Sequence, residues 1–252
     1  ASLVPAVADN PGEEPGVEFY RLGSGLAHGV SDDGSTVVGE NSQGAFAWTR
    51  EGTTSLGGIA GIAANMDGSL ITGDVADTTG NSAGRWSAGN WIAFGALGIS
   101  GCDSSLSSAY DISSDGARCV GLGWSGCSAS AFLWSDSAGI TALPQDGPNS
   151  SRADTISGDG MVIGGWDEAT NGSRRAAVWF QNSTTGEWNE TILLEGLSGN
   201  AAGYGEVNGS NSDGSILLGS SNGSSIASDG AFVYRQGSGV EVLGMVPQDT
   251  AP

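Results

Sequence analysis

Acidic side chains that could work in pairs are the first chemical feature of this sequence. Two carboxyl groups, one an acid and the other a base or nucleophile, are the usual machinery for hydrolysing a glycosidic bond. The candidates, by their places in predicted loops, are Glu40, Asp74, Asp167, Glu168 and Glu206. The chain holds 28 acidic residues, so finding several of them on one face has little specificity. A secreted carbohydrate-active hydrolase is therefore an alternative and not the main interpretation.

Two tryptophans near these acids suggest a binding surface instead. Trp124 and Trp166 break the regular spacing of the other aromatic residues, and Asp167 and Glu168 directly follow Trp166. An aromatic ring has a broad apolar face that can pack on a sugar ring beside polar groups. We predict a glycan-binding surface that includes these four residues and Tyr204. The alternative is that both tryptophans are hydrophobic anchors of their loops.

The single histidine limits metal and nucleophilic chemistry. His28 cannot form a multi-histidine metal site alone, and no Gly-x-Ser-x-Gly elbow accompanies it to indicate a catalytic triad. Its position in the repeat described below is mixed, which fits a residue lining a central channel. The other repeats have Ile62, Tyr110, Asp154 and Asn208 there. We expect no cofactor, with calcium as a weak alternative because oxygen ligands are abundant.

Three cysteines allow one disulfide and one free thiol. Cys119 falls in a predicted strand at a position where other repeats have aliphatic residues, so we expect a buried side chain. Cys102 and Cys127 fall in loops on one predicted face of the same repeat. We predict a Cys102–Cys127 disulfide, which is typical of extracytoplasmic proteins. The alternative is three reduced thiols.

The charge of the chain excludes several function classes. All 8 basic residues are arginines, and the formal net charge is −20. Such a chain repels phosphate backbones and anionic membrane surfaces, so neither nucleic-acid binding nor membrane association is expected. No apolar stretch approaches the roughly 18 residues that cross a bilayer. Lysine Schiff-base chemistry and a Walker lysine are impossible. The acidity and the small residues at the start fit a secreted, mature chain.

A repeat supplies the elements that position these side chains. A small residue, a Ser or Asn and an Asp-Gly pair precede a hydrophobic run that ends in glycine. The Asp-Gly pairs begin at Asp33, Asp67, Asp115, Asp159 and Asp213. A segment ending in an aromatic follows, at Trp48, Trp86, Trp134, Trp179 and Tyr234, and then a segment that usually ends in Leu-Gly. We expect the recurring aromatics to pack between repeats.

This pattern predicts an all-β fold, a β-propeller of five four-stranded antiparallel blades. Asp-Gly between two β-prone runs is a strong hairpin signal, and four strands per repeat with a fixed aromatic is the sequence form of a propeller blade. The 44 glycines argue against helices. We expect an extended leader over residues 1–16 and one propeller domain over 17–252, with repeats at about 24–58, 59–98, 106–145, 150–197 and 201–244.

The motifs resemble a known family. The small residue, Val-Ser, Asp-Gly and aliphatic-Gly, followed by Ala-Phe-x-Trp and Leu-Gly, look like the His-Ala-Phe repeat family of extracellular bacterial proteins. The resemblance covers residues 17–244. It implies secretion and a repeat architecture, and supplies no catalytic residues.

One predicted strand is surplus. Residues 18–22 look like a sixth copy of the closing segment. They could complete the fifth blade and leave Val240 to Leu243 as an extra edge, or pair with another molecule by strand addition. We favour closure within one chain. The sequence as a whole predicts an extracellular or cell-surface module, binding or structural, whose partners are glycans or matrix and surface components.

Overall fold

The computed structural model describes residues 20, 22–98, 105–194, 204–221 and 230–243. These residues form twenty strands in five four-stranded antiparallel sheets, and no helix occurs among them. Each sheet takes its strands in sequence order from the inner to the outer edge, as a propeller blade does. The all-β prediction of five four-stranded blades is confirmed. None of the described residues forms a helix that could cross a membrane.

The strands of each blade fall within the five predicted repeats. The first two blades consist of β1 (Leu26–Val30), β2 (Val37–Asn41), β3 (Gly44–Thr49), β4 (Gly52–Ser55), β5 (Ala60–Ala64), β6 (Leu70–Asp77), β7 (Gly80–Ser87) and β8 (Asn90–Ala93). The third and fourth consist of β9 (Ser107–Ile112), β10 (Arg118–Ser125), β11 (Ser128–Ser135), β12 (Gly139–Ala142), β13 (Ser151–Ile156), β14 (Val162–Glu168), β15 (Arg174–Gln181) and β16 (Trp188–Leu194). The fifth consists of β17 (Gly205–Ser210), β18 (Ile216–Ser221), β19 (Gly230–Arg235) and β20 (Gly239–Val242).

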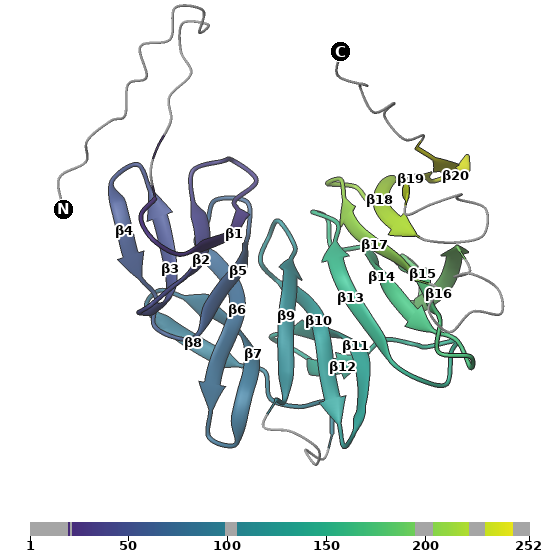
Figure 1. Cartoon of the computed structure of the whole chain (residues 1–252), viewed down its shortest axis with the longest axis horizontal. Coiled ribbons are helices and arrows are strands. Elements are labelled where there is room, and N and C mark those ends of the chain that lie inside the picture. The colour runs from purple at the N-terminus through teal and green to yellow at the C-terminus, as the bar shows by residue number, and fades with distance from the viewer. Residues whose placement is uncertain (1–19, 21, 99–104, 195–203, 222–229, 244–252) are drawn as a thin grey trace, which may run out of the picture.

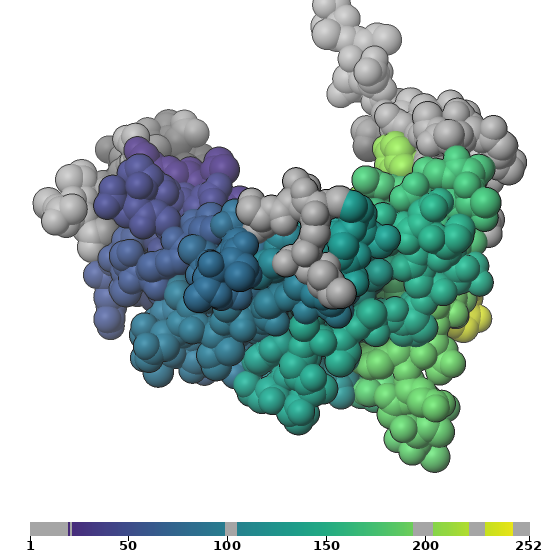
Figure 2. All heavy atoms as spheres, turned by 90° about the horizontal axis from the view of Figure 1, so that it is seen from below, coloured from purple at the N-terminus to yellow at the C-terminus, as the bar shows by residue number. Residues whose placement is uncertain are grey.

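The blades follow one another in an arc. Figure 1 shows the first blade and the fifth blade at the two ends of this arc, with β9 near its middle. Figure 2 shows the same order from below, with the colours running from purple to yellow. Each blade packs against the next through its innermost strand, whereas among the described strands none of the first blade packs closely on the fifth. The innermost strands β1, β5, β9, β13 and β17 therefore share one central space.

The Asp-Gly turns join the two inner strands of every blade, as predicted. In the first blade, Ser31 Oγ donates to Asp33 Oδ1 (2.7 Å), and the same carboxylate accepts from the Ser35 amide (2.9 Å). Gly34 follows with φ +72°, a conformation that glycine adopts without strain. In all five turns the aspartate accepts the amide two residues on, because the sequence repeats the chemistry.

Backbone hydrogen bonds connect each turn to the next around the arc. Asp33 N donates to Met66 O (3.0 Å), Met66 N to Ser114 O (3.0 Å), and Ser114 N to Gly158 O (2.9 Å). Asp159 N completes the series by donating to Ser212 O (2.8 Å). This end of the inner strands is therefore a connected rim, which we call the turn end.

The hydrophobic core lies between neighbouring blades. Trp179 is fully buried and donates from Nε1 to Pro144 O of the preceding blade (2.7 Å). Trp134 stacks on Phe94 of the second blade with ring centroids 4.2 Å apart. Trp48 is buried too, while Trp86 and Tyr234 are partly buried in clusters that join two blades. The expectation that the recurring aromatics pack between repeats agrees with these contacts.

The fifth blade is not completed in the way that we favoured. The fourth strand of the fifth blade is β20, which pairs with β19, so Val240 belongs to the blade and is not an extra edge. Tyr20 lies against Trp48 of the first blade, with ring centroids 5.5 Å apart. Residues 18, 19 and 21 lie outside the described residues. The part of this segment that is described thus contacts the first blade.

Candidate functional site

A β-bulge interrupts the innermost strand of every blade at the same place. In β13, for example, Ala153 pairs with Gly165 and Thr155 pairs with Gly164, which leaves Asp154 without a partner across the ladder. The five bulged residues are His28, Ile62, Tyr110, Asp154 and Asn208. A bulge re-aims a side chain without ending the strand. The fold therefore presents one side chain per blade in the same way.

A glycine opposite each bulge makes this geometry possible. An added Cβ at Gly165 would collide with the carbonyl oxygen of Arg152, two residues before the bulged Asp154. The same collision with a β-strand carbonyl would occur in the other blades. The glycines concerned are Gly39, Gly73, Gly121, Gly165 and Gly219. The glycine that ends each predicted hydrophobic run is thus required by the close approach of the inner strand.

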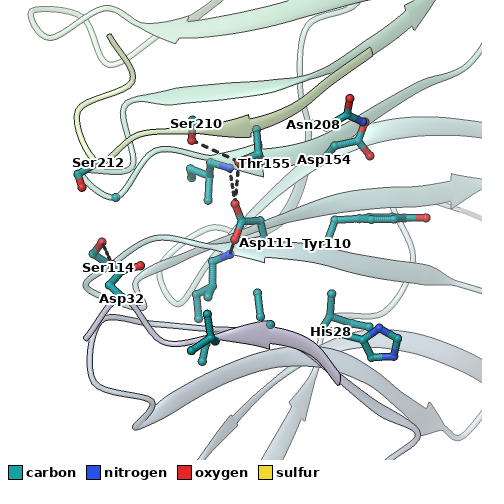
Figure 3. Close-up of a pocket in the computed structure, with 18 of the residues that line it drawn as sticks. His28, Asp32, Tyr110, Asp111, Ser114, Asp154, Thr155, Asn208, Ser210 and Ser212 are labelled. Carbon is teal, nitrogen blue, oxygen red and sulfur yellow. Dashed lines mark hydrogen bonds between the residues drawn. The ribbon is translucent and has the colours of Figure 1, made fainter. Parts of the chain in front are cut away.

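All five bulged residues line a central cavity of about 490 Å³. Figure 3 shows its side chains at successive levels along the inner strands, with His28, Tyr110, Asp154 and Asn208 at the level farthest from the turns. The first two blades line it with the apolar side chains of Val30 and Ile62, together with His28 and Asp32. The other three give it a polar wall. Among the described residues no arginine lines this cavity, whereas three aspartates do, so the interior is acidic.

At the middle level of the cavity, the polar groups form hydrogen bonds with one another. Asp111 Oδ2 accepts from Thr155 Oγ1 (2.9 Å) and from the Ile156 amide (2.8 Å) of the next blade. Thr155 Oγ1 lies 3.2 Å from Ser210 Oγ of the fifth blade. Burial raises the pKa of Asp111 to about 6. This cluster joins the third, fourth and fifth blades. Within it, Asp111 accepts hydrogen bonds from protein groups and needs no ligand to supply them.

Asp154 is held from one side only. Its Oδ1 accepts from Arg152 Nε at 2.5 Å, while its Oδ2 is buried and has no hydrogen-bond partner. The side chain is 8% exposed. Burial raises the pKa of Asp154 to about 7, although the Arg152 charge acts in the opposite direction. One oxygen of this carboxyl group is thus fixed and the other lacks a partner.

Two arginines and an acid fix the surroundings of Asp154. Arg152 Nη2 lies 3.4 Å from Glu206 Oε2, and Arg174 Nη1 lies 2.8 Å from Glu206 Oε1. Trp166 lies against both guanidinium groups, at 5.5 Å from Arg152 and 4.3 Å from Arg174. Such cation–π contacts and ion pairs hold long side chains in place. The network crosses from the fourth blade to the fifth.

The residues of the predicted glycan-binding surface do not lie together in the structure. Trp166 is 4% exposed and packs against Arg152 and Arg174, so it is not an open platform for a sugar ring. Asp167 is fully buried and pairs with Arg175 (2.8 Å). Trp124, Glu168 and Tyr204 are half-buried and do not line the cavity. Of the predicted residues, only His28 belongs to the cavity lining.

The carboxylates that suggested a hydrolase are engaged elsewhere. Glu206 binds two arginines, and Asp167 accepts from the backbone amides of Asp146 (3.0 Å) and Gly147 (2.8 Å). Asp74 accepts from the Ala109 amide (3.2 Å), and burial raises its pKa to about 6. Glu40 lies 3.7 Å from His28 Nε2. No two of these groups form a pair that faces the cavity among the described residues.

A separate acid cluster of Glu190, Asp167 and Asp146 lies outside the cavity lining. Burial, followed by the charge of Asp167, raises the pKa of Glu190. Glu190 Oε2 accepts from the Asp146 amide at 2.5 Å. Within the part of the chain that the structure describes, no group of three His, Cys, Asp or Glu side chains is placed to hold a metal ion. Calcium binding stays an untested alternative.

The cysteines occupy different environments. Cys119 is a free thiol, fully buried in β10, and burial raises its pKa to about 12, as suits the small buried residue that we expected. Cys127 is disulfide-bonded. Cys102 lies outside the described residues, so the Cys102–Cys127 pairing stays a prediction.

Sequence reasoning identified the mixed position but missed the arginine network. The signal was present, because Arg152 and Glu206 occupy the same repeat position in adjacent blades and carry opposite charges. Neighbouring inner strands bring such positions together. A comparison of each repeat position between adjacent blades would have found this pair.

The fold is shared with known propeller proteins. TolB from Acinetobacter baumannii superposes with a TM-score of 0.54 at 13% identity, over 86% of this chain and 55% of that one. A puromycin-hydrolyzing peptidase from Mycobacterium tuberculosis gives 0.51 at 13% identity, over 86% and 36%. Prolyl oligopeptidase B from Galerina marginata gives 0.52 at 11% identity, over 89% and 37%. This chain thus spans about half of the Acinetobacter TolB, 80% of a putative TolB from Agrobacterium tumefaciens (TM-score 0.55, 12% identity, 87% of this chain) and a smaller part of the peptidases.

These likenesses support a β-propeller fold alone. No protein-family model matches the chain, and no curated protein matches it in sequence. The resemblance to the His-Ala-Phe repeat family is therefore unsupported, although its repeat architecture agrees with the blades.

Proposed function

We propose that this chain is a binding module that receives a small polar ligand in its central cavity. One observation carries the proposal: five identical backbone bulges present five different side chains to one space. A position that served packing alone would repeat its residue type, as the turn aspartates do. Concave sites with a few convergent polar groups are the usual form of small-ligand sites.

The cavity suits a ligand that donates hydrogen bonds. Asp154, Asn208 and Tyr110 bring a carboxyl, an amide and a hydroxyl group to the polar wall, and Oδ1 of Asn208 also accepts from Ser220 Oγ (3.2 Å). Ile62 provides an apolar contact on the opposite wall. A monosaccharide or a small amino compound has this mixture of polar groups and apolar faces. The size of the cavity fits a small molecule better than a polymer chain.

A hydrolase receives less support than a binding module. A carboxylate mechanism needs two acids on opposite sides of a scissile bond. Glu206 is held by two arginines and Asp167 is buried against Arg175. The likeness to propellers of peptidases gives no support to glycoside hydrolysis.

The location and the partners of this module are proposed from the sequence alone. An extracellular or cell-surface location, with glycan or matrix partners, is proposed from the acidity of the chain. Association of protomers by strand addition through the N-terminal residues also stays a prediction.

A ligand screen followed by amide NMR tests the proposal. We expect monosaccharides or amino compounds to shift signals of β9, β13 and β17, and expect Asn208→Leu to weaken binding about tenfold by removing a polar group from the wall. Thr53→Leu on the exposed strand β4 is the matched control and should bind normally. Shifts confined to outer loops, or release of sugar from a glycan substrate, would contradict a cavity-binding module.

A further inference from the structure

Each of the first four blades packs its second strand against the innermost strand of the next blade. Val38 in β2 and Val120 in β10 lie one residue before the glycine opposite the bulge, and both are fully buried against the following blade. In β14 this position is Gly164, where an added Cβ would meet Val207 of the fifth blade. Leu218 holds the position in β18 and is 51% exposed. The fifth blade therefore has an uncovered packing face.

The first blade is uncovered on its opposite side. Val30 of β1 is 56% exposed, whereas Ile112 and Ile156, at the same place in β9 and β13, are buried in clusters with the preceding blade. Ala27 is exposed too, although Ala153 at its place in β13 is fully buried. Apolar side chains in such positions gain free energy when a partner removes them from water. The two end faces of the arc in Figure 1 are thus two halves of the contact that joins adjacent blades.

One contact that a preceding blade would supply is present at the first blade. Trp134 of the third blade stacks on Phe94, which directly follows the fourth strand of the second blade. Trp48, at the corresponding place of the first blade, meets Tyr20 instead, with ring centroids 5.5 Å apart. Tyr20 therefore lies where the end of a preceding blade would lie.

The sequence spacing indicates what is missing. Leu22 and Gly23 precede the first residue of β1 by the same number of positions as Leu56 and Gly57 precede that of β5. A closing segment thus stands before the first blade without three strands of its own among the described residues. Residues 1–19 form the longest run outside those residues, and they are fewer than the three inner strands of the first blade require. They also include three prolines, which central strands do not accommodate.

We infer that the uncovered faces of the first and fifth blades together bind one three-stranded antiparallel unit of this same repeat, which lies outside residues 1–252. Its innermost strand packs on Leu218 of β18, and its second strand packs on Ala27 and Val30 of β1, as in every pair of adjacent blades. The segment that ends at Leu22 closes the unit as its fourth strand. This interaction surface is independent of the ligand cavity and of the proposed function.

A second copy of the chain fits the two faces less well. Each of its three-stranded units is already closed by a fourth strand of the same blade, so none is left for the segment that ends at Leu22. Two copies with a formal net charge of −20 each also repel one another.

Titration of the full chain with a synthetic peptide of residues 26–49, followed by amide NMR, tests the inference. The peptide supplies the three inner strands of one blade without a cysteine. We expect shifts in β1 and β18, and expect Leu218→Asp and Val30→Asp each to weaken binding at least about tenfold. Both side chains are exposed, so the fold tolerates the charge. Ile92→Asp is the matched control on the outer strand β8, where Ile92 is 47% exposed, and should bind like the parent.

A second experiment attaches the unit to the chain. Repeating residues 26–49 after Pro252, through a Gly-Ser linker, raises the effective concentration of the unit. Amide hydrogen exchange in β1 and β18 should slow at least about tenfold relative to the parent. Val37→Asp within the added copy should abolish this slowing, because the position of Val37 is fully buried against the preceding blade in the other four blades.

The outcomes decide between the possible occupants of the two faces. Binding of the peptide at β1 and β18, or slowed exchange in the extended chain, supports the inference. Absence of peptide shifts together with unchanged exchange in the extended chain would overturn it. Dimers of the parent in sedimentation velocity that Leu218→Asp abolishes would overturn it too, because a second copy would then cover the faces. Equal weakening by Ile92→Asp would show that the peptide does not use these faces.

Discussion

The turn end and the bulge level of the same inner strands show two uses of a repeat. At the turn end both the backbone and the side chains recur, and Asp33, Asp67 and Asp213 accept the same hydrogen bonds in their blades. At the bulges the backbone recurs but the side chains differ, as His28 and Asp154 illustrate. Full repetition marks architecture. Repetition of the backbone alone marks a place where the fold presents chemistry.

The acid–base properties of the two levels differ in the same way. A backbone hydrogen bond from Ser35 lowers the pKa of Asp33, and a side-chain hydrogen bond from Ser69 lowers that of Asp67. Burial raises the pKa of Asp154 to about 7. Ionisation of the turn aspartates thus stabilises the folded state, whereas ionisation of Asp154 destabilises it.

Blocking one bulge should have the largest effect on stability. Gly165→Ala places a methyl group against the Arg152 carbonyl, so the inner strand must shift. We expect the free energy of unfolding to fall by about 3 kcal/mol, typical of severe overpacking. Urea unfolding measures this value. A loss no larger than that of the turn variant Gly34→Ala would contradict the importance of the close approach.

Removing the buried charge should change the pH profile of stability. The pKa of Asp154 rises from 3.8 to about 7 on folding, so the folded state holds a proton that the unfolded state releases. The free energy of unfolding should therefore fall as the pH rises from about 4 to about 7, and Asp154→Asn should reduce this fall by about 2 kcal/mol. Urea unfolding across this range checks it. Parallel profiles for parent and variant would contradict the assignment.

Changing one turn should have the smallest effect. Gly34 has φ +72°, and nothing lies within 4 Å of an added Cβ, so Gly34→Ala introduces backbone strain without a collision. We expect a loss of about 1 kcal/mol in the free energy of unfolding. Gly34→Asn should lose less, because asparagine adopts this conformation more readily. Equal losses for both variants would show that something other than the dihedral angle matters.

The sequence predicted what is local and repeated. The Asp-Gly pairs gave the hairpins, and their five copies gave the blades. The position of His28 and Asp154 was also visible, because its residue type differs from repeat to repeat. The burial of Trp166 agrees with the alternative of a hydrophobic anchor, but the sequence could not decide for it, because the burial depends on Arg174 and Arg152 packing against the ring across strands. Exposure of a single aromatic is set by such tertiary contacts and leaves no local signal.

The arc of blades has a consequence for how the molecule opens. Among the described strands, the extensive packing is between blades that are adjacent in the sequence, and one hydrogen bond from Ser114 Oγ to Asp32 Oδ2 links the turns of the third and first blades. Stability in such an array is close to a sum of single units and the interfaces between neighbours. The first and fifth blades each have one such interface, whereas the three central blades have two. Amide hydrogen exchange should therefore be fastest in the terminal blades and slowest in β9 and β10, as fraying spreads inward from both ends.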